Sequence, residues 1–145
     1  MKLVLLRQED VGIGSAVEAG MLVPGIHDEE GFGASADLIV SREWKPLALH
    51  FNNEISDNHE HHTEWLSTLI IVGPAAWPVR PVSELYVDHV VGEETELSAL
   101  FGAIWSAEDT IDVDAAFREG RTLAGTPEQE VRLGFTWRID IWGKK

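Results

Sequence analysis

The end of the sequence alternates between apolar and other side chains, and this pattern constrains the fold more than any other feature. Within residues 131–142, every odd-numbered position holds a large apolar residue: Val131, Leu133, Phe135, Trp137, Ile139 and Ile141. Successive side chains of a β-strand point to opposite faces of a sheet, so a period of two residues predicts a long strand with one buried face.

Weaker alternation predicts more strands upstream. Residues 36–40 and 47–51 have strand-like patterns and flank the turn segment 41–45, so together they predict a β-hairpin. Residues 2–6 and 84–91 predict two further strands. The sequence therefore predicts a mainly antiparallel β-sheet.

Two segments predict helices. Residues 94–106 place apolar side chains at the spacing of one helix face: Leu97, Leu100, Phe101, Ile104 and Trp105. A shorter helix is predicted from Asp57, whose spacing to Glu60 suits a capping box, to about Ile70, although residues 69–72 fit a strand equally well. We therefore expect an α+β fold, a mainly antiparallel sheet with one or two amphipathic helices packed on a face.

The length of 145 residues favours a single globular domain over residues 1–145. Cysteine is absent, which excludes disulfides and thiolate chemistry and favours a reducing compartment. The first apolar run meets Glu9 and Asp10 too soon for a signal-peptide core, and no run reaches about 18 apolar residues. These features predict a cytoplasmic protein that does not bind a membrane.

The charge of the chain is strongly negative. Twenty-five Asp and Glu against eleven Lys and Arg give a formal net charge of -14, and residues 8–41 and 81–117 contain no Lys or Arg. Nucleic acids and anionic lipids are bound through Lys and Arg, so both are disfavoured as partners. Two readings stay open: the charge only keeps the protein in solution, or it attracts a basic protein partner.

The densest group of potential metal ligands lies in residues 57–64, and its members are His59, His61, His62 and Glu64. A helical zinc protease site needs a second His four residues after the first, where this chain has Thr63. On a strand, His59 and His61 would share a face. This pair followed by Glu64 resembles the first metal-binding motif of the cupins, which implies a metal held by two His and a Glu on β-strands. Glu64 stands one residue early for that motif, and the second cupin motif does not follow.

A second group of residues is typical of a protein-binding surface. Acidic residues follow the predicted helix where its dipole does not favour them, and several Trp fall outside the apolar faces. The candidate partner-binding residues are Glu108, Asp109, Asp112, Asp114, Trp44, Trp77 and Trp142. Exposed Trp beside acids suits a protein-binding hot spot and also a sugar-stacking platform.

From the sequence we favour a non-catalytic acidic module, an immunity- or inhibitor-type protein that occludes a basic effector such as a nuclease or toxin. We expect no catalytic residues and no cofactor. One alternative is a small metal-dependent or sugar-binding β-domain that uses the His59, His61, His62 and Glu64 group. Another is a structural or assembly component, such as a phage particle protein.

Overall fold

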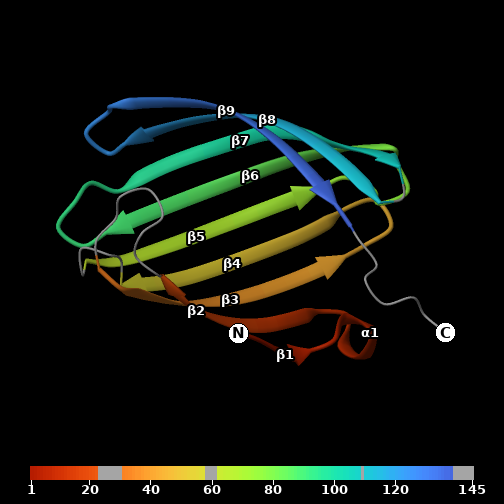
Figure 1. The fold of residues 1–145 in the computed structure, drawn as a ribbon, viewed down its shortest axis with the longest axis horizontal. Coiled ribbons are helices and arrows are strands. Elements are labelled where there is room, and N and C mark those ends of the chain that lie inside the picture. Colours follow the sequence, from red (N-terminus) through yellow and green to blue (C-terminus); the bar gives the residue numbers. More distant parts are fainter. Residues whose placement is uncertain (23–30, 58–61, 109, 139–145) are drawn as a thin grey trace.

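The computed structural model describes residues 1–22, 31–57, 62–108 and 110–138. These residues form one antiparallel sheet of nine strands, in which each strand pairs with its neighbours in the sequence (Figure 1). From β2 onward the strands have 9 to 13 residues, about twice the usual length of about 5–6 residues. The elements are β1 (Lys2–Leu6), the short helix α1 (Gln8–Val11), β2 (Gly14–Leu22), β3 (Gly33–Glu43), β4 (Ala48–Asp57), β5 (Thr63–Val72), β6 (Val79–Val90), β7 (Glu96–Glu108), β8 (Ile111–Thr122) and β9 (Pro127–Trp137).

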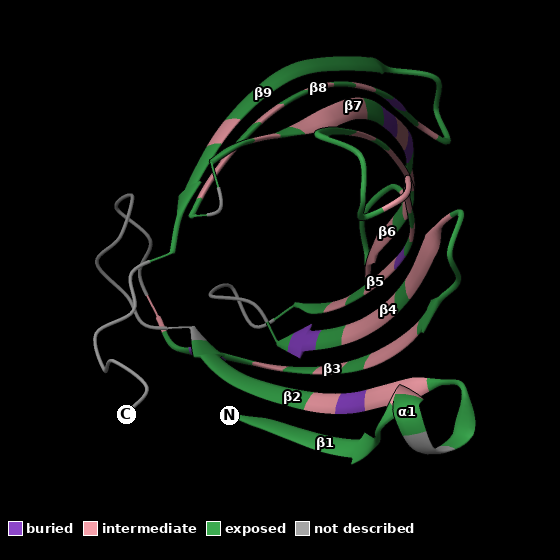
Figure 2. Cartoon of the chain, turned by 90° about the vertical axis from the view of Figure 1, so that its right-hand side faces the viewer, coloured by how far each residue is buried: buried purple, intermediate pink, exposed green. Residues whose placement is uncertain are grey.

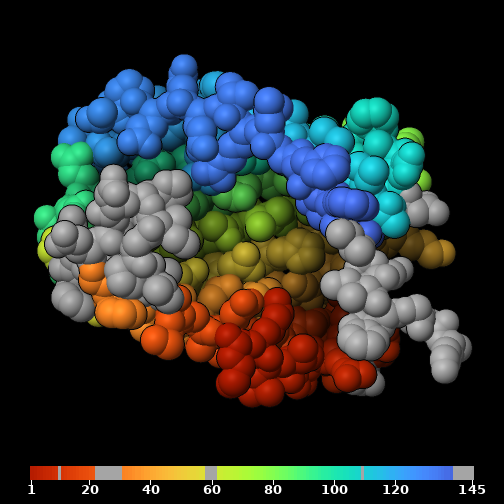
Figure 3. All heavy atoms as spheres, viewed as in Figure 1, coloured from red at the N-terminus to blue at the C-terminus, as the bar shows by residue number. Residues whose placement is uncertain are grey.

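The sheet curls across its width into an open C, with β1 and β9 at the two tips (Figure 2). The connections at residues 44–47 and 73–78 lie at one end of the strands, which we call the turn end, and we call the opposite end the loop end. Seen from the open side, the central strands lie in a hollow between the N-terminal strands and β9 (Figure 3). In the described part of the chain, no second layer packs on either face of the sheet.

The strand register divides the side chains between two faces. The outer face holds the odd-numbered residues of β2 and of β4 to β9 and the even-numbered residues of β3; the inner face holds the others. The inner face is the concave one because its side chains converge. A Cβ added to Gly102 would lie 2.6 Å from the Cβ of Ala116, and one added to Gly120 would lie 2.8 Å from that of Ser98. Opposite Cβ atoms of an ordinary sheet are about 4.5–5.5 Å apart.

This fold buries almost no hydrophobic core. Among the described residues, the buried hydrophobic side chains are Ala16 and Leu100, and both belong to the inner face. The accessible surface is 10653 Å², whereas a compact monomer of this mass has about 7,400 Å². The sheet therefore leaves an unusually large area to its surroundings.

The predicted α+β fold is wrong, because the helical content of the described residues is limited to α1, which has four residues. Residues 96–106 of the longer predicted helix belong to β7. The helical pattern arose because the inner face of β7 also carries apolar side chains, Leu100 and Ile104, beside those of the outer face. Hydrogen bonding to β6 and β8 outweighs the helical spacing, and Gly102 weakens a helix at its centre.

The shorter predicted helix is wrong as well. Asp57 is the last residue of β4, and residues 63–72 form β5, so the strand alternative for residues 69–72 is confirmed. Glu60 lies outside the described residues. The local signal for a helix was a capping-box spacing. The hydrogen-bonded ladders that β5 forms with β4 on one side and with β6 on the other outweigh it.

The predicted strands are confirmed, with different bounds. The β3–β4 hairpin contains the segments predicted at 36–40 and 47–51 and extends beyond them, and residues 2–6 form β1. Residues 84–90 belong to β6 and residues 131–137 belong to β9. Residues 91 and 138 lie outside these strands, and residues 139–142 of the last predicted strand lie outside the described residues. The predicted burial of one face of β9 is wrong, since the side chain of Leu133 is 81% exposed. The alternation correctly predicts a strand, but the apolar face meets no other part of the described chain.

Candidate functional site

The inner face carries a charged network at its centre. Arg118 on β8 reaches across β7 to Glu84 on β6, with Nη2 donating to Oε1 at 3.0 Å. The guanidinium also lies over the ring of Tyr86, 4.6 Å from its centroid. The side chains of Arg118 and Glu84 are only 13% and 18% exposed. This partly buried pair ties β6 to β8 on the concave side of the sheet.

Tyr86 continues the network toward the loop end. Its hydroxyl donates to Oδ2 of Asp88 at 3.1 Å. Burial raises the pKa of Tyr86, and the negative charge of Asp88 and this hydrogen bond raise it further, while Arg118 acts in the opposite direction. The phenol therefore stays protonated at neutral pH and acts as a hydrogen-bond donor rather than as a base.

Acidic side chains gather on the inner face toward the loop end. Burial raises the pKa of Glu64, and the nearby charges of Asp88, Glu54 and Glu93 add to the effect. The pKa of Glu96 is raised as well, chiefly by burial. The inner face is thus a polar surface with a negative potential at this end, which water and cations stabilise.

The outer face has the opposite character. Within β2 to β9, every exposed large hydrophobic side chain belongs to it. These side chains are Met21, Leu38, Phe51, Ile55, Trp65, Leu69, Ile71, Val79, Leu85, Val87, Leu97, Phe101, Trp105, Val113, Phe117, Val131, Leu133, Phe135 and Trp137. A contiguous apolar surface of this extent marks a site that meets another apolar phase or partner.

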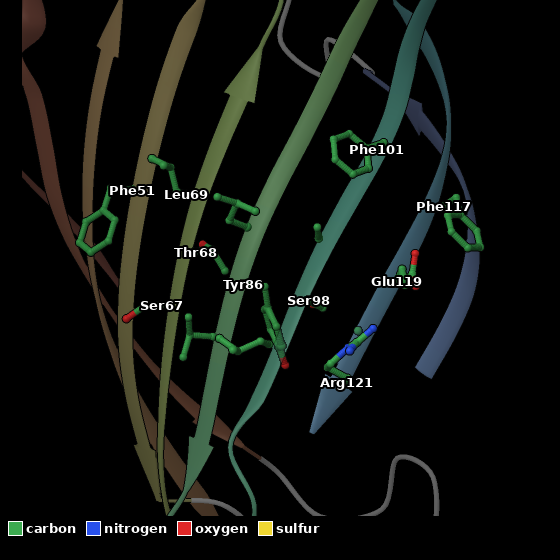
Figure 4. A pocket seen from close by; sticks show the side chains of 15 residues that line it. Phe51, Ser67, Thr68, Leu69, Tyr86, Ser98, Phe101, Phe117, Glu119 and Arg121 are labelled. Atoms are coloured by element: carbon green, nitrogen blue, oxygen red, sulfur yellow. The ribbon is translucent and has the colours of Figure 1, made fainter. Parts of the chain in front are cut away.

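A shallow hollow of about 630 Å³ lies over β4 to β8 (Figure 4). Most of its wall comes from apolar side chains of the outer face: Phe51, Leu69, Leu85, Phe101 and Phe117. Glu119 and Arg121 stand at one side of it. This lining suits hydrocarbon better than a polar ligand, because a polar ligand would lose its hydrogen bonds to water without replacement.

Tryptophan side chains concentrate at the turn end of the strands. Trp44 and Trp77 lie in the β3–β4 and β5–β6 connections, Trp105 is near the end of β7, and Trp137 ends β9. Trp65 lies near the loop end, at the start of β5. All five are more than a third exposed. The guanidinium of Arg42 stacks on the ring of Trp44, 4.7 Å from its centroid.

The candidate partner-binding residues are partly brought together. Trp44, Trp77 and the exposed Glu108 all lie at the turn end. Asp112 and Asp114 follow at the start of β8 on the inner face, where Oδ1 of Asp112 accepts from Ser106 at 2.7 Å and Oδ2 from Arg138 at 3.2 Å. The last two candidates, Asp109 and Trp142, lie outside the described residues.

The candidate metal ligands do not form a site in the described part of the chain. His59 and His61 fall outside it, and Nδ1 of the exposed His62 lies 3.6 Å from Oε1 of Glu93. Glu64 points to the inner face of β5. No group of three or more His, Asp or Glu among the described residues is placed to hold a metal ion.

Sequence patterns did not single out the charged network or the apolar outer face. The members of the network are 34 residues apart, and their contact depends on the register of three strands. One signal was present: Arg80, Glu84 and Asp88 recur every four residues and share the inner face of β6. The alternation within each strand also shows which side chains share a face of the sheet, but it does not indicate which of the two faces meets water.

Comparisons with known proteins found no similar family model, curated protein or solved structure for this chain. Among the described residues, no helix has the length and apolar character needed to cross a membrane.

Proposed function

We propose that the chain forms a lipid-embedded wall whose inner face lines a passage for polar solutes. The observation that carries the proposal is the segregation of the two faces: every exposed large hydrophobic side chain of β2 to β9 belongs to the convex outer face. A sheet folded in water turns its apolar face inward, whereas a sheet surrounded by acyl chains turns it outward. Strands of 9 to 13 residues also suit a bilayer, which a tilted strand crosses in about 9–11 residues.

The exposed large hydrophobic side chains of the outer face form an apolar band. This band is inclined to the strands, as expected for strands that cross a bilayer at a tilt. One row of the register joins Leu49 on β4 to Val131 on β9 through Ile71, Ser83, Phe101 and Phe117. On β4 this row is the turn-end limit of the band, and on β9 it is the loop-end limit. The centre of the band thus moves by about six residues, or about 20 Å, across five strand spacings, or about 24 Å. The resulting inclination is about 40°, against about 35–45° for strands that span membranes.

Two polar residues within the band are paired with each other. Asn53 and Ser67 face outward on β4 and β5, and Nδ2 of Asn53 donates to Oγ of Ser67 at 2.5 Å. Such a pair reduces the cost of placing an amide and a hydroxyl in an apolar phase. The strands β3 to β8 likewise have a paired strand on each side, so that their backbone groups are satisfied as hydrocarbon requires.

The positions of the tryptophans also support contact between the outer face and a bilayer. Indole rings prefer the boundary between acyl chains and head groups, because one part is apolar and the N–H needs a polar partner. Trp105 and Trp137 lie on the outer face at the turn end of the band, and Trp65 lies on the outer face at its loop end. They lie at the two levels where a bilayer would meet water.

This proposal departs from two expectations drawn from the sequence, a cytoplasmic location and the absence of a membrane partner. The net charge of the whole chain predicted no membrane binding, but net charge does not distinguish the two faces of the sheet. Once the register is known, most acids of β4 to β7 belong to the inner face: Glu54, Glu64, Glu84, Asp88 and Glu96. The two others, Asp57 and Glu108, are the last residues of β4 and β7 and lie at the ends of the sheet. Charge on the inner face does not oppose contact of the outer face with acyl chains.

Neighbouring residues on one strand provide the test. The chain has no cysteine, so Phe51→Cys on the outer face and Asn52→Cys on the inner face, both near the centre of the band on β4, can each carry a single environment-sensitive fluorophore. In lipid vesicles, we expect the probe at position 51 to emit at shorter wavelength and to be quenched by nitroxides on the acyl chains. The probe at position 52 should instead be quenched by iodide from the water.

The two positions are matched in depth, so each serves as the control for the other. Equal access of iodide to both probes would contradict the proposal. So would a chain that remains monomeric in buffer without detergent and does not bind vesicles; the acidic protein-binding hypothesis would then be the better one.

A further inference from the structure

The two edge strands of the sheet differ in how well they are protected. β1 has five residues, and its pairing with β2 is interrupted by a register shift between Val4 and Leu6. β9 has 11 residues and pairs with β8 without interruption from Pro127 to Trp137. Short, irregular edges resist pairing with another chain, whereas long regular edges promote it. Among the described strands, β9 is therefore the one whose free edge can accept a partner strand.

Hydrogen bonding to β8 shows which backbone groups of β9 face its free edge. The N–H of Arg138 donates to the carbonyl of Thr110, and the carbonyl of Thr126 accepts from the N–H of Thr122. Even-numbered positions therefore bond to β8, since directions alternate along a strand. The odd-numbered positions, Gln129, Val131, Leu133 and Phe135, turn their N–H and carbonyl groups to the free edge. Pro127 has no N–H to offer.

We propose that two copies of the chain join edge to edge, with β9 antiparallel to its symmetry mate around a two-fold axis at Val131. The charges of β9 select this register. With Val131 opposite itself, Glu130 of each copy lies opposite Arg132 of the other, which makes two ion pairs on the inner face. A centre at position 129 would oppose Glu128 to Glu130, and a centre at position 130 or 132 would oppose like residues.

The side chains of Glu130 and Arg132 are exposed enough to form ion pairs with the other copy. Within one copy, Nη2 of Arg132 already lies 2.8 Å from Oε2 of Glu130, and both side chains are about half exposed. The two-fold axis is perpendicular to the sheet, so it keeps inner face with inner face and outer face with outer face. Outer-face Leu133 would lie opposite Gln129 of the other copy, and the ladder would end where Phe135 meets Pro127, which lacks a donor.

This inference goes beyond the lipid-facing role and does not depend on it. Edge pairing needs only the free ladder and the charges of β9, whereas the lipid proposal needs only the outer face. The experiment below therefore reports on the dimer alone, and the fluorophore experiment reports on the outer face alone.

Single cysteines locate the axis. In a hydrogen-bonded antiparallel pair the opposite Cα atoms are about 5.5 Å apart, within reach of a disulfide. We expect Val131→Cys to form a linked dimer on mild oxidation of the folded full-length chain. Gln129→Cys or Leu133→Cys alone should link poorly, and a mixture of these two variants should link well. Equal linking at all three positions, or none at 131, would overturn the proposed register.

Charge reversal tests what selects the register. Arg132→Glu or Glu130→Arg should each weaken dimerisation by about tenfold, measured by analytical ultracentrifugation, because two opposite-charge pairs become like-charge pairs. The double variant, Glu130→Arg with Arg132→Glu, should restore dimerisation, which a merely misfolded chain would not do. A monomer at all concentrations in the unsubstituted protein, or no rescue in the double variant, would exclude the proposed dimer.

Discussion

The inner face packs small and charged side chains closely together, whereas the outer face spreads large apolar side chains that few atoms contact. Two consecutive residues of β7 illustrate the difference: Leu100 on the inner face is 7% exposed, and Phe101 on the outer face is 64% exposed. Curvature explains this contrast, because side chains converge on the concave side of a sheet and diverge on the convex side. Burial in this molecule therefore follows the shape of the sheet more than the hydrophobicity of the side chain.

The largest effect should come from a charge in the middle of the apolar band. Phe101→Arg should reduce the free energy of unfolding from lipid vesicles by about 2–4 kcal/mol, because a guanidinium at the bilayer centre loses its hydration. Val79→Arg, at the turn-end limit of the band, should cost only about 0–1 kcal/mol. Urea titrations of vesicle-bound protein measure both values. Equal losses in the free energy of unfolding would show that positions 101 and 79 do not lie at different depths in the bilayer.

The inner face should respond to the loss of its central ion pair. Glu84→Gln leaves Arg118 in place without its charged acceptor, and we expect a loss of about 2 kcal/mol, typical of a hydrogen bond to a charged group. Glu119→Gln on the outer face is the control, because an exposed side chain usually changes stability by less than about 0.5 kcal/mol. Similar losses in both variants would show that the network does not stabilise the curled sheet.

Because the concave inner face is crowded, adding a single methyl group there should destabilise the fold. A Cβ at position 102 would lie 2.5 Å from the carbonyl oxygen of Ala115 and 2.6 Å from the Cβ of Ala116, so Gly102→Ala must displace backbone. We expect a loss of about 1–2 kcal/mol from this overpacking. Ala103→Val adds two carbons to the exposed outer face next to it and should be nearly neutral. Thermal unfolding of the two variants compares the faces directly.

The weakest effect concerns pH. Burial and neighbouring acids raise the pKa of Glu64 above 4.5, so the folded protein binds this proton more tightly than the unfolded chain does. Stability from this group is greatest below the unfolded pKa and is lost as the pH rises through the folded pKa. Glu64→Gln should therefore raise the melting temperature slightly at pH 7 and flatten its dependence on pH above about pH 4.5. A variant that melts lower at pH 7 would contradict this sign.

The sequence predicts strands well where one face is polar and the other apolar, as in the β3–β4 hairpin and β9. It mispredicts β7 because Leu100 and Ile104 make the inner face apolar as well, and a segment apolar on both faces also satisfies a helical spacing. The outward direction of the apolar face could not be predicted, since alternation is the same for either direction. Curvature decides this direction, and it depends on small residues that lie opposite each other in the register, such as Gly102 with Ala116 and Gly120 with Ser98.

Because each strand pairs with its sequence neighbours, the sheet can grow by one hairpin at a time. Each new strand needs only a short loop to close, so the entropy cost of every step is small and the contacts form locally. A hairpin can also be gained or lost without rerouting the rest of the chain, because the described strands include no crossover connection. The width of this sheet is therefore a property that insertion or deletion of a single hairpin can change while the topology stays the same.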